Sequence, residues 1–297
     1  MTKFPSAEKV AMNKPQKSNR RSVIATIFLV ALSVYSLLPL YWLIVSATKD
    51  GSSLFSSFAF WFDDPRDFFT NLEQVFAYND GIYLTWIRNS AIYALASGIG
   101  ATIVSLFAGY ALSKFEFFGR GLTLFLVFGA VLVPTTALAI PLYILLSQIG
   151  LVNTIWAFIL PSMLNPLGIV LMKVYSDSAV PKELIEAARV DGASEWRILF
   201  TISSPLLVPG IVTVFLFTVV ATWNNYFLPL IVLSNPNLYP LTVGLAAWNS
   251  QAGAGGGSQI LFPLVITGAV IAIIPMVALF LFLQRFWQSS LTLGAVK

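Results

Sequence analysis

The chain has 297 residues, of which 57% are hydrophobic and only 10% are charged, and it contains neither cysteine nor histidine. Soluble domains carry roughly 25% charged residues, so this chain has too few to cover a water-facing surface. The composition indicates an integral membrane protein. It excludes disulfides and thiolate chemistry, and with them the commonest zinc ligands and the commonest general base. The formal net charge of +4 is small for a nucleic-acid-binding protein.

The first elements are a basic tail and one long apolar run. Residues 1–21 carry the basic cluster Lys3, Lys9, Lys14, Lys17, Arg20 and Arg21, and about 27 residues without charge follow. A helix needs about 20 apolar residues to cross a bilayer, so residues 22–47 are predicted to be the first transmembrane helix. A signal peptide is the alternative, since "VSA" at 45–47 resembles a cleavage site, but its apolar core would span only about 7 to 15 residues.

Residues 48–85 are predicted to form an extracytoplasmic loop. Six acidic side chains lie here against two basic ones: Asp50, Asp63, Asp64, Asp67, Glu73 and Asp80 against Lys49 and Arg66. Because Lys and Arg favour cytoplasmic loops, the basic tail and the other basic segments are assigned to the opposite side. This orientation makes both termini cytoplasmic in a multi-pass protein of the cell membrane.

The remaining charge-free intervals predict five more helices, which form a core over residues 86–287. Residues 89–113 suffice for one crossing, and 121–172 for two helices joined at the turn-like "SQIGLVN". Residues 198–284 are divided into two helices by the long polar region 234–259. The predicted fold is an all-α integral membrane protein with six transmembrane helices, and residues 288–297 form a cytoplasmic tail.

The segment 181–204, between the predicted fourth and fifth helices, is unusually charged for this chain. Pro181 suits a first helical position, Gly192 suits a left-handed helix end, and Ser194 suits the cap of a second helix that ends before Pro205. The pattern therefore predicts two short helices with a corner. Ala187 and Ala188 are expected to leave a surface of small residues beside Glu186, where another protein approaches closely.

The same segment resembles the cytoplasmic signature of the membrane permease subunits of binding-protein-dependent ABC importers. That signature runs E-A-A, three residues, G, nine residues, I, one residue, L-P. This chain has Glu186, Ala187 and Ala188, then Gly192, Ile202 and Pro205 at the same spacing, with Ser204 in place of the usual leucine. The resemblance implies the type I importer (MetI-like) permease fold, with 181–204 as the coupling segment.

Further stretches, spread over most of the chain, resemble the carbohydrate branch of these permeases and its maltose-type inner-membrane component. These stretches are "RNSAIYA" from Arg88, "GYALSKFEFFGR" from Gly109, "LVPTTALAIPLYILL" from Leu132, "GLVNTIWAFILP" from Gly150, "WNNYFLPL" from Trp223 and the terminal "LTLGAVK". The implied function is a sugar importer subunit that forms half of the translocation path. A permease for peptides or amino acids is the alternative within the family.

The resemblance also implies partners and the roles of residues in the coupling segment. The partners are a second permease subunit, two ATPase subunits, an extracytoplasmic sugar-binding protein and membrane lipid, without nucleic acid. The coupling segment contacts the ATPase through Glu186, Ala187, Ala188, Asp191 and Gly192. A plainer interpretation of Glu186 is an ion pair with Arg189 on its own helix, worth a few tenths of a kcal/mol.

The chain is not expected to be an enzyme. It lacks the G-x-x-x-x-G-K-[ST] loop that cradles nucleotide phosphates, so ATP and magnesium are assigned to the partner ATPase, and neither a cofactor nor a metal site is expected here. An ion-coupled secondary carrier is the rival class. The predicted helix cores contain no Asp, Glu, Lys or Arg, which argues against proton coupling more firmly than against sodium coupling.

Two further groups of residues are candidates for transport itself. A sugar path needs uncharged hydrogen-bonding groups and aromatic faces, and packing between helices uses the same residue types. The path candidates are Trp223, Asn224, Asn225, Asn165, Ser162 and Thr135. The predicted outer loop 249–259 is glycine-rich, and Gly253, Gly255, Gly256 and Gly257 are assigned to contact with the binding protein, a plain flexible linker being the alternative.

Overall fold

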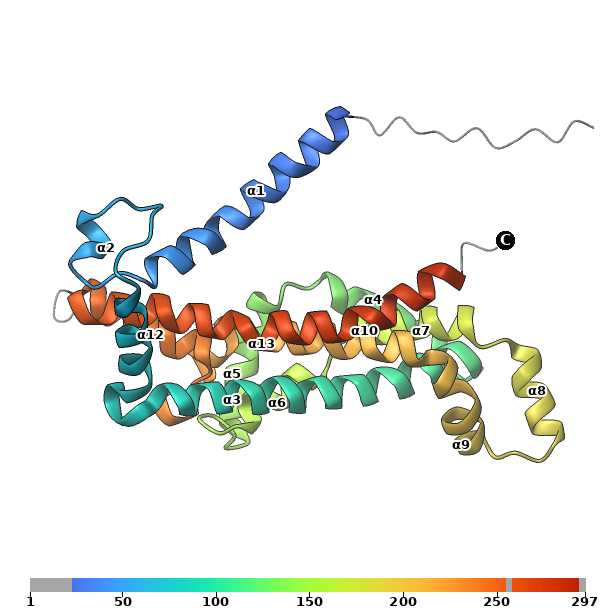
Figure 1. The fold of residues 1–297 in the computed structure, drawn as a ribbon. Coiled ribbons are helices and arrows are strands. Elements are labelled where there is room, and N and C mark those ends of the chain that lie inside the picture. The colour runs from blue at the N-terminus through green and yellow to red at the C-terminus, as the bar shows by residue number, and fades with distance from the viewer. Residues whose placement is uncertain (1–22, 255–257, 294–297) are drawn as a thin grey trace, which may run out of the picture.

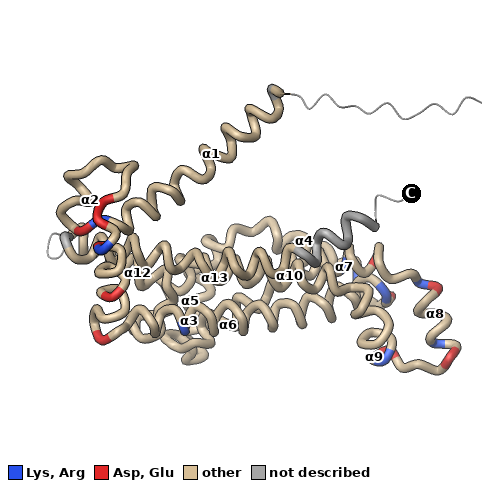
Figure 2. Tube along the Cα trace, in the orientation of Figure 1, with Lys and Arg blue, Asp and Glu red and all other residues tan. Residues whose placement is uncertain are grey.

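Helices form all the regular structure in the part of the chain that the computed structural model describes, residues 23–254 and 258–293. Figure 1 shows an elongated bundle in which α3, α10 and α13 run side by side, with α8 and α9 at one end and α2 and α12 at the other. We call these the α8 end and the α12 end. Nearly all charged residues in Figure 2 lie at these two ends, and the stretch between them is almost free of charge.

The first helix stands apart from the bundle. Helix α1 (Val23–Ser46) is apolar along its length, contains Pro39 and exposes most of its large side chains, and it contacts α13. A short connection with α2 (Ser53–Ser56) follows. This connection is tied to α3 by Asn71, whose amide group donates hydrogen bonds to the carbonyl oxygens of Ala47 and Lys49, at 3.1 and 2.9 Å.

Helix α3 (Pro65–Lys114) is the longest element, and it is two helices joined by a break. Asp64 caps its first turn, and Pro65 occupies a position where the missing N–H costs nothing. Residues Tyr78–Gly81 leave helical geometry, with positive φ at three consecutive residues. Part of the predicted loop 48–85 is therefore helical, and an unbroken helix runs from residue 82 to Lys114.

The middle of the chain folds into two broken pairs of helices. Helix α4 (Arg120–Leu132) is followed by the 3-10 turn η1 (Thr135–Leu138) and α5 (Ala139–Gln148), and the pair is bent by 100° at Pro134. Helix α6 (Trp156–Met163) leads directly into α7 (Pro166–Ala179). Proline supplies no N–H and restricts the residue before it, which explains why both breaks lie beside a proline.

The last third of the chain contains the charged segment and two long helices. Helix α8 (Lys182–Val190), the short α9 (Glu195–Arg197) and the π-helix η2 (Ile198–Ser203) lead into α10 (Ser204–Trp223). Helix α11 (Phe227–Val232), the turn η3 (Pro236–Leu238) and α12 (Leu241–Gly253) precede α13 (Ser258–Leu293). Helix α12 occupies half of the region 234–259, which the sequence predicted only as a polar divider.

Five helices in the described residues are long and apolar enough to cross a membrane, and counting the bent pair α4–α5 as one span makes six. The bundle centres on α3, which packs most extensively against α7 and α10. Small residues permit this contact: a Cβ added at Gly109 would lie 2.7 Å from the backbone nitrogen of Lys173. Close backbone approach through small residues is the usual way that helices associate in lipid.

Candidate functional site

The corner between α8 and α9 has the backbone geometry of a Schellman motif. Gly192 has φ 78°, which confirms the left-handed conformation predicted for it. The N–H groups of Gly192 and Ala193 donate to the carbonyl oxygens of Arg189 and Ala188, at 3.0 and 2.9 Å. These two bonds satisfy carbonyls that the helix end would otherwise leave without partners. The turn from α8 into α9 is therefore fixed by backbone hydrogen bonds.

The second helix begins as predicted but ends differently. Ser194 caps it by accepting a hydrogen bond from the backbone N–H of Arg197 at 3.4 Å. The prediction that this helix ends before Pro205 is wrong, because α9 continues through η2 into α10. Pro205 lies in the first turn of α10, where its ring is tolerated. The second helix of the segment and α10 therefore form one continuous helix, from Glu195 to Trp223.

One face of α8 packs against the bundle. Ile185 and Ala188 are only 3% and 7% exposed, and they belong to an apolar cluster with Ile198 and Leu199 from η2. Ala188 thus lies on the face of α8 that packs against the bundle. The sequence predicted it on the exposed surface beside Glu186. Its small side chain lets α8 lie close to the bundle.

The opposite face of α8 is an exposed stripe. Glu183, Glu186, Ala187 and Val190 follow one another at helical spacing, and all four are exposed, Val190 to 87%. Asp191 and Gly192 continue this surface at the corner, where both are exposed. We call Glu183, Glu186, Ala187, Val190 and Asp191 the outward stripe. It combines carboxylates with an apolar centre, which suits contact with another protein.

An ion pair joins the two helices across the corner. The Arg189 Nε atom donates to Glu195 Oε1 at 2.6 Å, and the guanidinium lies 6.0 Å from the centre of the Phe115 ring. The hydrogen bond to Glu195 raises the pKa of Arg189. Arg189, which the plainer interpretation paired with Glu186, is therefore bound to Glu195. Among the described residues no ion pair includes Glu186.

The six path candidates lie in three places. Trp223 ends α10, and Asn224 and Asn225 follow it; Ser162 is in α6, and Asn165 caps α7. Thr135 lies in the exposed bend between α4 and α5. No hydrogen bond within the described residues joins any two of the six. The structure brings Trp223 and the two asparagines together and leaves Thr135 apart from them.

Several of these side chains are occupied by packing contacts. Trp223 is 7% exposed in a cluster with Tyr83, Trp86 and Trp248. Asn165 donates to Thr218 Oγ1 at 2.9 Å and accepts from the backbone N–H of Gly168 at 3.0 Å, which joins the start of α7 to α10. The Asn224 amide donates to the carbonyl of Val220, yet Asn224 and Thr135 are exposed.

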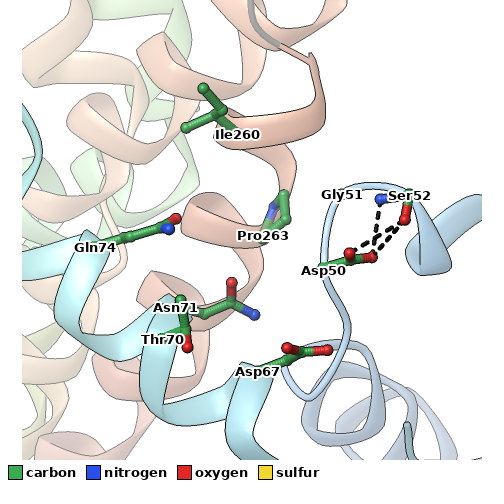
Figure 3. A pocket seen from close by; sticks show the side chains of 9 residues that line it. All are labelled: Asp50, Gly51, Ser52, Asp67, Thr70, Asn71, Gln74, Ile260 and Pro263. Atoms are coloured by element: carbon green, nitrogen blue, oxygen red, sulfur yellow. Dashed lines mark hydrogen bonds between the residues drawn. The ribbon is translucent and has the colours of Figure 1, made fainter. Parts of the chain in front are cut away.

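The α12 end carries an open polar cavity of about 360 Å³. Figure 3 shows Asp50, on the loop before α2, facing Asp67 and Asn71 on α3, with Ile260 and Pro263 of α13 above them. Hydrogen bonds from Ser53 and Ser52 lower the pKa of Asp50. Gly253 is the last residue of α12 and is exposed, whereas Gly255, Gly256 and Gly257 lie outside the described residues. In the described part of the chain, no group of three or more Asp or Glu side chains could hold a metal ion.

The same end contains a set of contacts that the sequence analysis did not identify. Side chains on one face of α3 donate to backbone carbonyls of the connection between α11 and α12. Trp86 Nε1 donates to Pro236 at 2.9 Å, Asn89 Nδ2 to Asn237 at 2.8 Å, and Tyr93 OH to Leu238 at 2.8 Å. We call Trp86, Asn89 and Tyr93 the clasp. Their spacing of three and four residues, partly within "RNSAIYA", was the available signal.

The chain is similar to membrane components of transport systems, both by its family model and by its individual relatives. Residues 101–292 match the family model described as "Binding-protein-dependent transport system inner membrane component". The arabinooligosaccharides transport system permease protein AraQ of Halalkalibacterium halodurans is 31% identical over 277 residues, covering 93% of this chain and 96% of that protein. The maltodextrin transport system permease protein MdxG of Bacillus subtilis is 30% identical over 289 residues, covering 96% and 100%.

A solved structure shares the fold. It is the crystal structure of a bacterial ABC transporter involved in the import of the acidic polysaccharide alginate. One of its chains matches with a TM-score of 0.76 and 24% identity, covering 92% of this chain and 99% of that one. The all-α, multi-span architecture predicted from the sequence is thereby confirmed as an ABC importer permease fold. The chain belongs to the family of binding-protein-dependent transport system inner membrane components.

Proposed function

We propose that this protein is the permease subunit of an ATP-driven sugar importer and forms half of its translocation path. The relatives named above are permease proteins for arabinooligosaccharides and maltodextrin, and each aligns with nearly the whole of this chain. The observation that carries the proposal is the outward stripe, an exposed and unpaired surface at the signature position of the family. Mono- or oligosaccharides are the proposed substrates, and peptides or amino acids are the alternative.

The outward stripe is proposed to contact the ATPase. Glu186 offers a free carboxylate, and the neighbouring methyl groups of Ala187 and Val190 offer an apolar surface without bulk. Asp191 and Gly192 form the edge of this contact, and Ala188 supports it from the inward face. Because Arg189 forms its ion pair with Glu195, the Glu186 carboxylate is available to a cation from the partner.

The proposed assembly places the α8 end in the cytoplasm. Both termini then lie on the cytoplasmic side, and the acidic first connection and α12 face the extracytoplasmic binding protein. A second, similar permease completes the path, and two ATPase subunits bind ATP and magnesium, so this chain binds no cofactor. Gly253 and the glycines at 255–257 are the proposed contact with the binding protein.

Fewer residues are proposed to contact the sugar than the sequence offered as candidates. Thr135, Asn224 and Asn225 retain polar atoms or exposed surface that a sugar hydroxyl could reach, and Ser162 is half-buried. Trp223 and Asn165 are already bound within the bundle, so their proposed role is to hold the path in shape. This division predicts that loss of Asn225 alters substrate dependence, whereas loss of Asn165 lowers stability first.

The test is uptake and ATP hydrolysis by the complete complex in proteoliposomes. Labelled sugars, a peptide and an amino acid are offered in turn with the binding protein, and the proposal expects ATP-dependent uptake of a sugar alone. Uptake that survives without ATP and stops when ion gradients are collapsed would contradict it.

Glu186→Ala should lower uptake and binding-protein-stimulated hydrolysis at least about tenfold, because a lost charged contact costs roughly 1.5–3 kcal/mol. Glu116→Ala, an exposed carboxylate of the connection between α3 and α4, is the matched control and should keep both activities. Equal activity in the two variants would remove the ATPase contact from Glu186.

A further inference from the structure

The last residues of α3, at the α8 end, bind the last turn of α7, directly before the coupling segment 181–204. Ser113 Oγ donates to Asp177 Oδ1 and Lys114 Nζ donates to the carbonyl oxygen of Val180, both at 2.6 Å. The second carboxylate oxygen of Asp177 accepts from Lys173 Nζ, also at 2.6 Å. We call Ser113, Lys114 and Asp177 the latch.

Each latch contact supplies a hydrogen-bond partner to a polar group that would lower the stability of the fold if it had none. Val180 is the residue that ends α7, and its buried carbonyl belongs to the set that a helix end leaves without backbone partners. The Lys114 ammonium supplies a charge-assisted bond and lies where the negative end of the α7 dipole favours a cation. One carboxylate oxygen of Asp177 accepts from Ser113 on α3, and the other accepts from Lys173 on its own helix, α7. Asp177 therefore holds α3 and α7 at a fixed separation.

A second contact holds the exit of the segment to the same helix. Ser203 Oγ donates to Tyr110 OH at 3.2 Å, and both residues are buried, at 0% and 3% exposure. Tyr110 lies one helical turn before Lys114. The residues that lead into α8 and those that follow α9 are therefore both bonded to the last turns of α3, and the segment between them projects from the bundle (Figure 1).

The other end of the unbroken part of α3 carries the clasp. From residue 82 to Lys114 the helix spans about 50 Å at 1.5 Å per residue. One end is bonded through the latch to the end of α7, directly before the coupling segment, and the other is bonded through the clasp to Pro236, Asn237 and Leu238. A shift of α8 thus has a continuous, hydrogen-bonded route to the connection between α11 and α12.

We propose that Ser113, Lys114 and Asp177 are positioning residues that transmit movement of the coupling segment to α3 and, through the clasp, to the connection before α12. This inference rests on the proposed function, since it requires an ATPase that moves α8. The ATPase contact itself is the work of the outward stripe. The latch does not affect binding of the ATPase to α8. It determines how much of the resulting movement reaches the connection before α12.

The experiment uses the complete complex in proteoliposomes with Lys114→Met, Asp177→Asn and the control Glu116→Gln, an exposed carboxylate of the connection between α3 and α4. Three quantities are measured: ATPase retained on the purified complex, basal hydrolysis, and hydrolysis stimulated by the loaded binding protein. Lys114→Met and Asp177→Asn should retain the ATPase and basal hydrolysis, and lose stimulation by at least about fivefold, the low end of typical coupling between sites. The control should keep all three.

Rescue separates positioning from general stability. Lys114→Arg keeps the cation and its donors, so it should recover stimulation. If the lysine were merely structural, Lys114→Met would lower the thermal unfolding midpoint but leave stimulation of the folded complex intact. Unchanged stimulation in Lys114→Met and Asp177→Asn overturns the inference, and so does loss of the ATPase from their complexes. Failure of the unaltered complex to respond to the binding protein would instead refute the proposed function.

Discussion

The two ends of the bundle are built in opposite ways. At the α12 end, the clasp side chains donate to backbone carbonyls, and a cluster around Trp86 and Trp248 is buried. At the α8 end, one face of a short helix packs inward and the other face is left exposed and charged. The outer face of the α12 end is held by contacts within the chain, whereas the outward stripe at the α8 end is exposed and is proposed to bind a partner. Stability and coupling should therefore respond to different residues.

The largest expected effect compares two tryptophans. Trp86 is 3% exposed and donates to Pro236, whereas Trp196 is 65% exposed at the α8 end, where it stacks on Phe200. Trp86→Ala should lower the free energy of unfolding by about 3–5 kcal/mol, because it leaves a cavity and an unpaired carbonyl. Trp196→Ala should cost less than about 1 kcal/mol. Thermal unfolding in detergent checks both, and similar losses would erase the contrast between the ends.

A smaller effect is expected at the corner glycine. Gly192→Val places a side chain at φ 78°, which costs about 1–2 kcal/mol and turns α8 away from its observed direction. The loss should appear as ATPase missing from the purified complex, with little change in the unfolding midpoint. Gly253→Val is the control, since a Cβ at Gly253 meets no atom within 4 Å and its φ is not left-handed. Retention of the ATPase by the Gly192 variant would show that the corner geometry is not needed for docking.

The smallest effect concerns acid at the α12 end. Hydrogen bonds from Ser53 and Ser52 hold the pKa of Asp50 below its ordinary value of 3.8. A lowered pKa in the folded state stabilises the protein above the unfolded value, and this contribution disappears as the pH falls through the folded pKa. Between pH 6 and 3, the unfolding midpoint of the natural chain should fall slightly more than that of Asp50→Asn. Parallel curves would mean that these hydrogen bonds add nothing.

The sequence predicted what depends on long runs and on local chemistry. Charge-free intervals located the apolar helices because a bilayer excludes charge over a fixed thickness. The corner at Gly192 followed from backbone sterics, and the cap at Ser194 from the orphan N–H groups of a helix start. Both features depend on neighbours only a few residues away.

Features set by distant contacts were not predicted. At the break Tyr78–Gly81, Asn79 and Asp80 adopt left-handed backbone geometry. Asparagine and aspartate can adopt this geometry at many positions but do so at few, so the sequence does not locate the break. Asn165 has the composition of a sugar contact, yet Thr218, 53 residues away, takes its amide group. The clasp pairs α3 with carbonyls some 150 residues further on, and carbonyls leave no trace in a pattern of side chains.

The π-helix between α9 and α10 also sets the register of everything that follows it. Residues Ile198–Ser203 hold more residues per turn than the α-helices on either side, so one residue is accommodated without a change in length. Winding all six residues as an ordinary α-helix would rotate α10 by about 100° relative to α9, and deletion of one residue would be needed to offset that rotation. The faces that Thr218 and Trp223 present to the bundle are therefore decided at the opposite end of the helix, by an insertion of one residue.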